Sequence, residues 1–95
     1  MSVYIIARIE VTDPEDYAAY AAQTVAQAEK AGGKFLVKGG DYVAVEGDDP
    51  DKRIVVVEFP TRQMALDWYN SPEYQEILPI ALRASQRELL IVDGV

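Results

Sequence analysis

The chain has 95 residues, of which 49% are hydrophobic and 26% are charged, so we expect one compact domain spanning residues 1–95. Sixteen acidic and nine basic residues give a formal charge of −7, which argues against binding to nucleic acid or to anionic membranes. Because the sequence has no cysteine and no histidine, it excludes thiolate nucleophiles, disulfides, histidine-ligated haem and Ser-His-Asp triads, and we expect no metal and no cofactor.

The beginning of the chain predicts a strand followed by a helix. The odd positions of Val3–Val11 are all apolar, which is the two-residue period of a strand. Asp13 followed by Pro14 is typical of a helix start, because Asp caps free N–H groups and Pro fits the first helical position. Apolar or small residues then recur with helical spacing as far as Gly32, so we expect this helix to end near Ala31.

The middle of the chain predicts two further strands. We interpret Lys34–Lys38 and Tyr42–Glu46 as one strand that bends at the two glycines between them. The segment Gly47–Asp51 has the composition of a turn. The β-branched run within Arg53–Phe59 predicts a central strand, and Pro60 ends it.

Two helical segments and a last strand complete the chain. Thr61 caps a predicted helix that ends near Asn70, and Ser71-Pro72 indicates a second helix start, with a disturbance expected at Pro79. Glu88–Val92 predicts the last strand. The order is β-α-β-β-α-β, which predicts an α+β, ferredoxin-like protomer in which helices cover one face of a four-stranded antiparallel sheet.

The other face of this sheet is predicted to mix apolar and charged side chains. The residues expected on it are Ile6, Arg8, Glu10, Ile54, Val56 and Glu58, joined by Leu36, Lys38, Tyr42, Glu46, Leu90 and Val92. Large apolar patches exposed to water usually mark interaction sites. We therefore predict that a second copy of the chain covers this face and that the protein is a homodimer.

The candidates for catalysis are Glu58 and Arg8, which we place with the same facing on neighbouring central strands. One interpretation is a structural ion pair. In the other, Glu58 accepts a proton while Arg8 or Lys38 holds an enolate or a carboxylate. The candidate substrate-binding residues are Lys38, Glu46, Arg53, Trp68, Tyr74 and Arg83.

Aromatic residues flank the break between the two later helical segments. Trp68, Tyr69 and Tyr74 are consistent either with the wall of a small pocket between helices and sheet or with plain core. The same two interpretations hold for Tyr17 and Tyr20 on the first helix.

Several motifs occur together along the chain. They are Y-I-I-A-R-I-E-V-T-D-P from Tyr4, the tyrosines Tyr17 and Tyr20, G-G-K-F-L-V-K-G-G from Gly32, Glu46-Gly47, R-I-V-V-V-E-F-P from Arg53, W-Y-N-S-P-E-Y-Q from Trp68, Arg83, and Val92-Asp93-Gly94. This combination resembles the domain of unknown function 1330 family, of the dimeric α/β-barrel superfamily.

The resemblance implies a ferredoxin-like protomer whose sheet pairs with a second sheet into a dimeric α/β barrel. The superfamily contains cofactor-independent oxygenases, small-molecule isomerases and haem-binding enzymes. In the family, an Arg commonly precedes the second pair of glycines, where this chain has Lys38, so a bidentate anion contact would become a point charge.

The favoured function is a cofactor-independent enzyme acting on a small organic acid or an enolisable carbonyl compound. The alternative is a non-catalytic homodimer that binds a small molecule or is purely structural, because one fold supports many functions. Met1 is not followed by a secretory signal and no apolar run would span a bilayer, so we expect a cytoplasmic protein.

Overall fold

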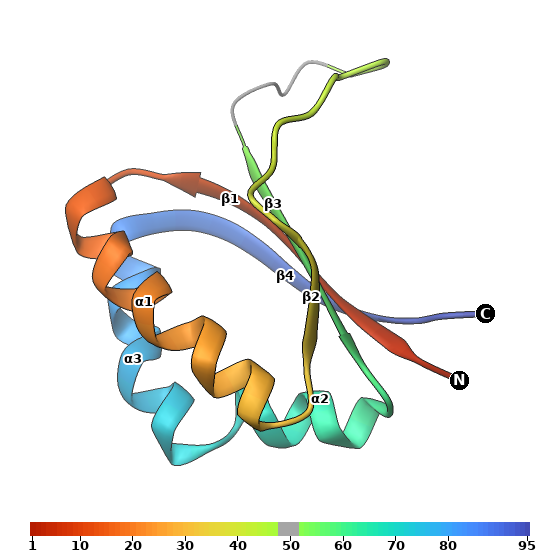
Figure 1. Ribbon diagram of the computed structural model, residues 1–95. Coiled ribbons are helices and arrows are strands. Elements are labelled where there is room, and N and C mark those ends of the chain that lie inside the picture. Colours follow the sequence, from red (N-terminus) through yellow and green to blue (C-terminus); the bar gives the residue numbers. More distant parts are fainter. Residues whose placement is uncertain (48–51) are drawn as a thin grey trace.

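The computed structural model describes residues 1–47 and 52–95, which form one four-stranded sheet and three helices (Figure 1). In chain order the elements are β1 (Val3–Val11), α1 (Pro14–Lys30), β2 (Lys34–Lys38), β3 (Arg53–Phe59), α2 (Arg62–Tyr69), α3 (Pro72–Ala84) and β4 (Ser85–Asp93). The strands lie in the order β2-β3-β1-β4, and each neighbouring pair is antiparallel. The predicted ferredoxin-like α+β fold is confirmed.

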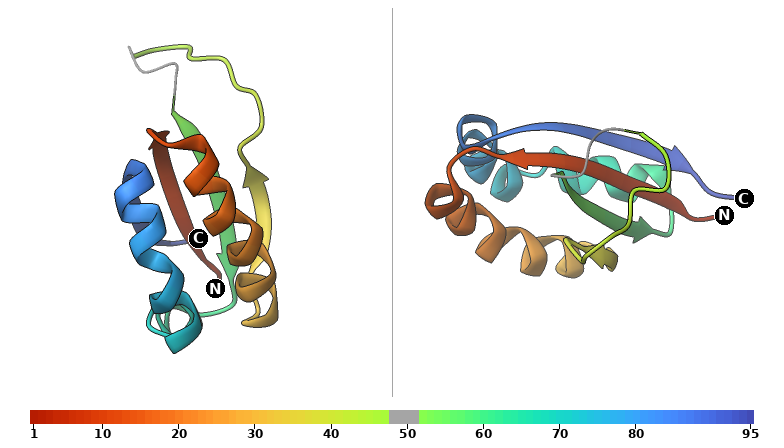
Figure 2. Two further views of the ribbon diagram at one scale, coloured as in Figure 1. Left: turned by 90° about the vertical axis from the view of Figure 1, so that its left-hand side faces the viewer. Right: turned by 90° about the horizontal axis from the view of Figure 1, so that it is seen from above.

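The helices lie on one side of the sheet and leave the other side open (Figure 2). The odd residues of β1 face the helices, as predicted: Val3, Ile5, Ala7 and Ile9 are each at most 4% exposed. Phe59 at the end of β3 and the aromatic residues of the helices complete this core. The apolar alternation of β1 therefore decides which face of the sheet is buried.

The helix starts follow from capping side chains. The side chains of Asp13, Thr61 and Ser71 each accept a hydrogen bond from the backbone N–H three residues further on, at 3.2, 3.1 and 3.2 Å. Pro14 and Pro72 occupy the first helical turn, where no backbone donor is needed. These are the starts that the sequence predicts.

Three predicted boundaries are wrong. Tyr42–Glu46 is not a strand, because the chain leaves the sheet after Lys38 and residues 39–47 form a projecting arm (Figure 1). Helix α3 continues through Pro79, whose missing N–H is tolerated while the apolar side of the helix stays buried. β4 begins at Ser85 rather than Glu88, since it pairs with β1 along its whole length.

Only Gly47 of the turn predicted at Gly47–Asp51 lies within the described residues. Among the helices described, none is both long enough and apolar enough to pass through a membrane.

A bulge in β2 changes the facing of its last residue. Phe35 pairs with Val57, but the next pair is Val37 with Val56, so one extra residue is inserted between them. As a result Lys38 lies opposite Val55 and faces the helices. Its predicted place on the open side of the sheet is wrong, because a shift of one residue exchanges the two faces.

Two glycines provide a test of packing beside β2. A Cβ on Gly33 would lie 2.8 Å from Cζ of the fully buried Phe59 and 2.9 Å from the backbone oxygen of Ala28, whereas a Cβ on Gly40 would meet nothing within 4 Å. We expect Gly33→Ala to lower the free energy of unfolding by about 1 to 3 kcal/mol, as overpacked sites do. The matched control Gly40→Ala should change it by less than about 0.5 kcal/mol. Urea unfolding of both variants checks this, and equal stabilities would contradict it.

Candidate functional site

A pocket lies between α1 and the helix-facing side of the sheet. The volume open to the centres of water molecules is about 60 Å³, several times what one water needs. Most of its surface is apolar, and α2 contributes Trp68 at one end. The lining residues are Ile5, Ala7, Ile9, Tyr17, Tyr20, Ala21, Thr24, Val25, Phe35, Lys38, Arg53, Val55, Val57, Trp68, Arg87 and Leu89.

Three cationic side chains line this pocket. Arg53 of β3 and Arg87 of β4 both pair with Ile9 of the strand between them, so they flank a buried residue in one row across the sheet. At a strand spacing of about 4.8 Å, their Cα atoms lie about 10 Å apart. Lys38 joins them from the edge strand. The lining residues include no Asp or Glu.

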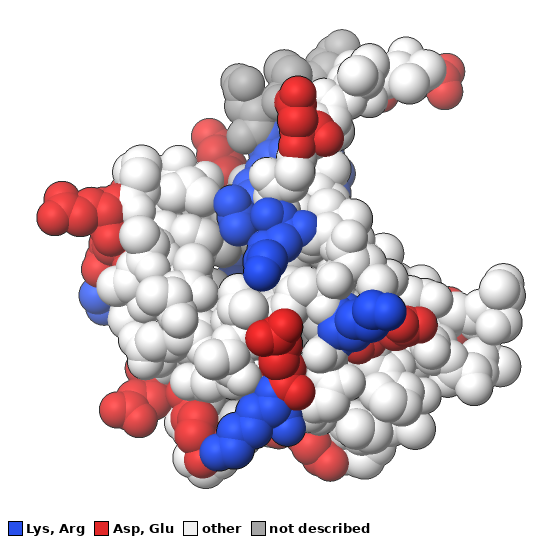
Figure 3. Space-filling model, viewed as in Figure 1, with Lys and Arg blue, Asp and Glu red and all other residues white. Residues whose placement is uncertain are grey.

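Basic side chains gather on the surface between α1 and the strands β2 and β3, below the arm (Figure 3). The pocket lining and this surface are therefore locally basic, although the whole chain has a formal charge of −7. A negatively charged molecule therefore meets a locally favourable field at the pocket.

Arg87 is held by two tyrosine hydroxyls. Its Nη1 donates to the Tyr20 oxygen at 3.0 Å and its Nη2 donates to the Tyr74 oxygen at 2.9 Å, and the two hydroxyls lie 2.7 Å apart. These contacts join β4 to both α1 and α3. Among the described residues, Arg87 forms no ion pair with a carboxylate.

The charge of Arg87 persists inside the protein. Burial lowers the pKa of its guanidinium, but the oxygens of Tyr20 and Tyr74 outweigh burial and raise that pKa above its usual range. Burial raises the pKa of the Tyr74 and Tyr17 hydroxyls, so both stay neutral at pH 7. The pocket therefore contains a largely buried cation that no carboxylate of the described chain neutralises.

Arg53 carries a buried hydrogen-bond donor, its Nε, that has no partner in the described part of the chain. The guanidinium lies against Gly39, which has a φ of +72°, and a Cβ at that position would collide with it. Gly39 therefore both turns the chain out of the sheet and leaves room for the Arg53 side chain. The sequence predicts only the bend.

The aromatic residues form the core and, in part, the pocket wall. The Trp68 ring lies 4.4 Å from the Tyr74 ring and 6.0 Å from the Phe59 ring, measured between centroids. Trp68 lines the pocket, and its buried Nε1 has no partner among the described residues. Tyr74 is fully buried behind the pocket, and its hydroxyl contacts the pocket residues Tyr20 and Arg87.

The structure places Arg8 and Glu58 on the open side of the sheet, on neighbouring strands. Arg8 pairs with Ile54 and Glu58 pairs with Tyr4, whose hydroxyl donates to the Glu58 carboxylate at 3.4 Å. Four residues of strand, about 13 Å, separate the two positions, so the register does not bring them together as an ion pair. Their catalytic roles stay predictions.

Glu46 lies on the arm and, with Arg8, lines a shallow hollow between the arm and the open side of the sheet. This hollow is separate from the pocket under α1, because the two share no lining residue. In the described residues, no cluster of three acidic side chains is arranged to hold a metal ion.

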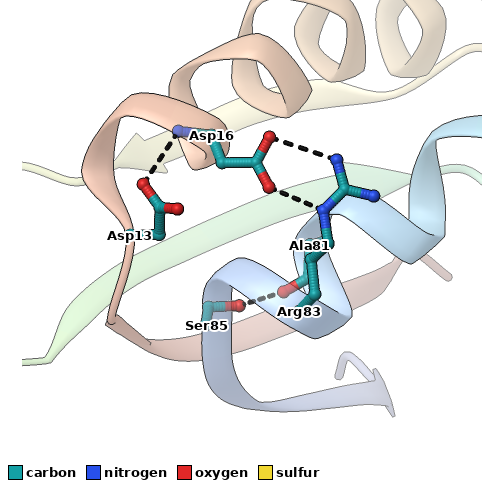
Figure 4. A network of polar contacts seen from close by, with 5 residues as sticks. All are labelled: Asp13, Asp16, Ala81, Arg83 and Ser85. Atoms are coloured by element: carbon teal, nitrogen blue, oxygen red, sulfur yellow. Dashed lines mark hydrogen bonds and ion pairs between the residues drawn. The ribbon is translucent and has the colours of Figure 1, made fainter.

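Arg83 lies on the surface and pairs with Asp16. Its Nε and Nη2 donate to the two carboxylate oxygens at 2.7 and 3.1 Å, which ties the end of α3 to the first turn of α1 (Figure 4). Asp13 caps the same turn of α1, and Ser85 donates to the backbone oxygen of Ala81 at the end of α3. Arg83 is not among the pocket residues, so the structure gives it a contact between helices.

Arg87 is not among the residues predicted for the site, and for Tyr20 the sequence leaves pocket wall and core open. The available signal was the alternation of β4: Leu89 and Ile91 are partly buried against the core, and Arg87 occupies the same facing two residues earlier. A charged residue at an inward-facing strand position is uncommon unless it has a partner. The predicted start of the strand at Glu88 concealed this, because it left Arg87 outside the pattern.

Comparison with protein families shows the family to which the chain belongs. Residues 2–95 match the family described as "Domain of unknown function (DUF1330)". The chain belongs to this family. No curated protein matches it.

Solved structures share the fold of this DUF1330 protein at low sequence identity. A protein of unknown function from Rhodopseudomonas palustris has a TM-score of 0.79 and 17% identity, over 99% of this chain and 82% of that chain. SnoaB, a cofactor-independent oxygenase from Streptomyces nogalater, has a TM-score of 0.72 and 15% identity, over 99% and 93%. A conserved protein from Methanosarcina mazei has a TM-score of 0.65 and 16% identity, over 100% and 94%. At these identities the similarity shows the fold alone.

The pair of Arg83 and Asp16 predicts a pH dependence. The hydrogen bond from Arg83 lowers the pKa of Asp16, so this carboxylate stabilises the fold above the unfolded-state pKa of about 3.9 and loses that effect as the pH falls through the lower folded-state value. We expect Asp16→Asn to be less stable than the wild type at pH 7, with the difference vanishing near about pH 2.

Urea unfolding at both pH values measures this difference. Glu15→Gln is the matched control, because Glu15 also lies in the first turn of α1 and has no ion pair in the described chain. A difference for Asp16→Asn that persists unchanged at low pH, or that Glu15→Gln reproduces, would contradict the assignment.

Proposed function

We propose that this protein binds a small organic anion in the pocket under α1 and is a cofactor-independent enzyme for a small organic acid or an enolisable carbonyl compound. The observation that carries the proposal is the largely buried Arg87 without a carboxylate partner, accompanied by Arg53 and Lys38 in the same pocket. A carboxylate or an enolate would supply the negative charge that the lining residues lack.

The arrangement suits a reaction in which negative charge develops on an oxygen atom. The apolar lining lowers the local dielectric constant, so a fixed guanidinium stabilises an enolate there more than it would in water. Arg87 is held in place by two hydroxyls before any ligand enters, which reduces the reorganisation that binding requires. The shared fold with SnoaB, described as a cofactor-independent oxygenase, supports chemistry in which the substrate itself carries the reactive electrons.

A second candidate is a non-catalytic binding protein. One observation favours it: the lining residues include no Asp or Glu, and the chain has no histidine, so the pocket lacks the carboxylates and imidazole that most often act as a general base. Both candidates need the same anion in the same pocket. Turnover of the bound compound separates them.

The single tryptophan of the chain reports on binding, because Trp68 lines the pocket. We expect butyrate to change its fluorescence saturably, and butyramide, which has the same shape without the charge, to bind at least about tenfold more weakly. Arg53→Met should weaken butyrate binding by a similar factor, since it removes a charged donor. The matched control Lys34→Met, on the same edge strand as Lys38 but paired with Glu58, should bind as the wild type does.

Equal binding of butyrate and butyramide would show that the pocket does not recognise charge. Loss of binding in Lys34→Met as great as in Arg53→Met would show that the net charge of the chain, and not the pocket, determines affinity.

We also propose that a second copy of the chain covers the open face, which we define by its exposed apolar residues Leu36, Val37, Leu90 and Val92. These side chains are 38 to 54% exposed, and partly buried residues of the central strands connect them. Covering the face would remove this apolar area from water, as in the barrel that the family resemblance implies. The cytoplasmic location expected from the sequence also stays a proposal.

Two leucines of similar exposure test this pairing. Leu90 lies on the open face and is 54% exposed, and Leu82 lies on the outer side of α3 and is 61% exposed. We expect light scattering to give a dimer for the wild type and for Leu82→Glu, and a monomer for Leu90→Glu, because a buried unpaired charge is costly. A monomeric wild type at micromolar concentration, or dissociation by both substitutions, would contradict the proposal.

A further inference from the structure

Hydrogen-bond counting in the network of Tyr20, Tyr74 and Arg87 fixes the direction of one hydroxyl group. The three groups are mutually within 2.7 to 3.0 Å. A guanidinium only donates, so each tyrosine oxygen accepts one hydrogen bond from Arg87. What remains to be placed is the proton of each hydroxyl.

The proton of Tyr74 has one available acceptor. Tyr74 is fully buried and does not line the pocket, and the polar neighbours of its hydroxyl in the described chain are Tyr20 and Arg87. Because Arg87 cannot accept, Tyr74 satisfies its O–H by donating to the Tyr20 oxygen. The opposite direction would leave a donor unsatisfied inside the core.

The proton of Tyr20 is then directed elsewhere. The Tyr20 oxygen already accepts from Tyr74 and from Arg87, so its own O–H needs an acceptor outside this network. The Tyr20 hydroxyl makes no further hydrogen bond to a described residue, although the Tyr17 hydroxyl also lies near Arg87, and Tyr20 lines the pocket. The free O–H group therefore points into the space that a ligand would occupy.

We infer that Tyr20 is the hydrogen-bond donor to an oxygen of the bound molecule, and that this molecule is a small 2-oxo acid or its enol. The inference rests on the proposed function, which places a carboxylate in the pocket. Tyr74 is a positioning residue, because it donates to the Tyr20 oxygen, so orients the Tyr20 hydroxyl, and does not itself line the pocket.

The geometry of the ligand follows from that of the network. The Tyr20 oxygen lies 3.0 Å from Nη1 of Arg87, so one small ligand can place a carboxylate beside Arg87 and a second oxygen where it accepts from Tyr20. A carbonyl or enol oxygen on the carbon next to the carboxylate satisfies this requirement. The small volume and the apolar remainder of the lining, including Ala7, Val55 and Leu89, leave room for a short apolar tail.

The test compares two ligands of nearly the same shape, pyruvate and methacrylate, which differ by a carbonyl oxygen in place of a CH₂ group. We expect the wild type to bind pyruvate more tightly, as measured by Trp68 fluorescence. Tyr20→Phe should weaken pyruvate binding about tenfold and leave methacrylate binding nearly unchanged, because it removes one hydrogen bond and no charge. The matched control Tyr69→Phe, whose ring lies 5.3 Å from that of Tyr74 but outside the pocket, should keep the wild-type preference.

Tyr74→Phe provides a second variant if Tyr20→Phe does not fold. It removes the Tyr74 oxygen, the other acceptor within reach of the Tyr20 hydroxyl, so that hydroxyl still donates to the ligand and the preference for pyruvate should persist. Loss of the preference in this variant would mean that Tyr74, and not Tyr20, supplies the proton, and would overturn the inference.

The outcomes separate this inference from the proposed function. If neither acid binds to the wild type, both are wrong. If both acids bind with equal affinity to the wild type, or if Tyr20→Phe keeps the preference for pyruvate, the inference is overturned and the anion pocket stands.

Discussion

The guanidinium of Arg87 connects the layers of this protein. It extends from the sheet and donates to one hydroxyl on α1 and another on α3, so the position of both helices depends on an arginine at an inward-facing strand position. An apolar side chain at that position would close the space by packing. The longer and charged side chain instead leaves a pocket beside it, in which Arg53 and Lys38 also lie. The cost of burying this charge is what makes an anionic ligand the natural complement.

The two faces of the sheet divide the chemistry of the chain. The helix side combines the apolar core with the cationic pocket, and the open side combines exposed leucine and valine side chains with Arg8 and Glu58. A fold whose helices cover one face has two surfaces to use, one for a small molecule and one for another protein chain. The proposed pocket and the proposed dimer interface therefore do not compete for the same residues.

Small irregularities of β2 and its neighbours place two of the three pocket cations. The bulge beyond Phe35 turns Lys38 to the helix side, and the left-handed conformation of Gly39 leaves the space that the Arg53 guanidinium fills. Neither feature changes the order of the elements. Both decide what the pocket can bind, because a shift of one residue exchanges a lysine for an apolar side chain on the helix side.

The sequence by itself determined the order of strands and helices and the buried face of β1. Strong local signals carry this information: the alternation in Val3–Val11, and the capping residues Asp13, Thr61 and Ser71, each of which acts within a few residues of its own position. Among the predicted site residues, Lys38, Arg53 and Trp68 do meet in one pocket, although the sequence did not show where that pocket lies.

Only the tertiary structure decided the register. Arg8 and Glu58 share a face of the sheet, as expected, but the pairing of β1 with β3 sets them four residues apart. Arg83 does not enter the pocket and instead contacts Asp16, which lies 67 residues away in the sequence. The pairing of β1 with β4 places Arg87 opposite Ile9 and within reach of Tyr20 and Tyr74. Such contacts join residues far apart in the chain, and no local pattern encodes them, because each depends on how far one strand slides along its neighbour.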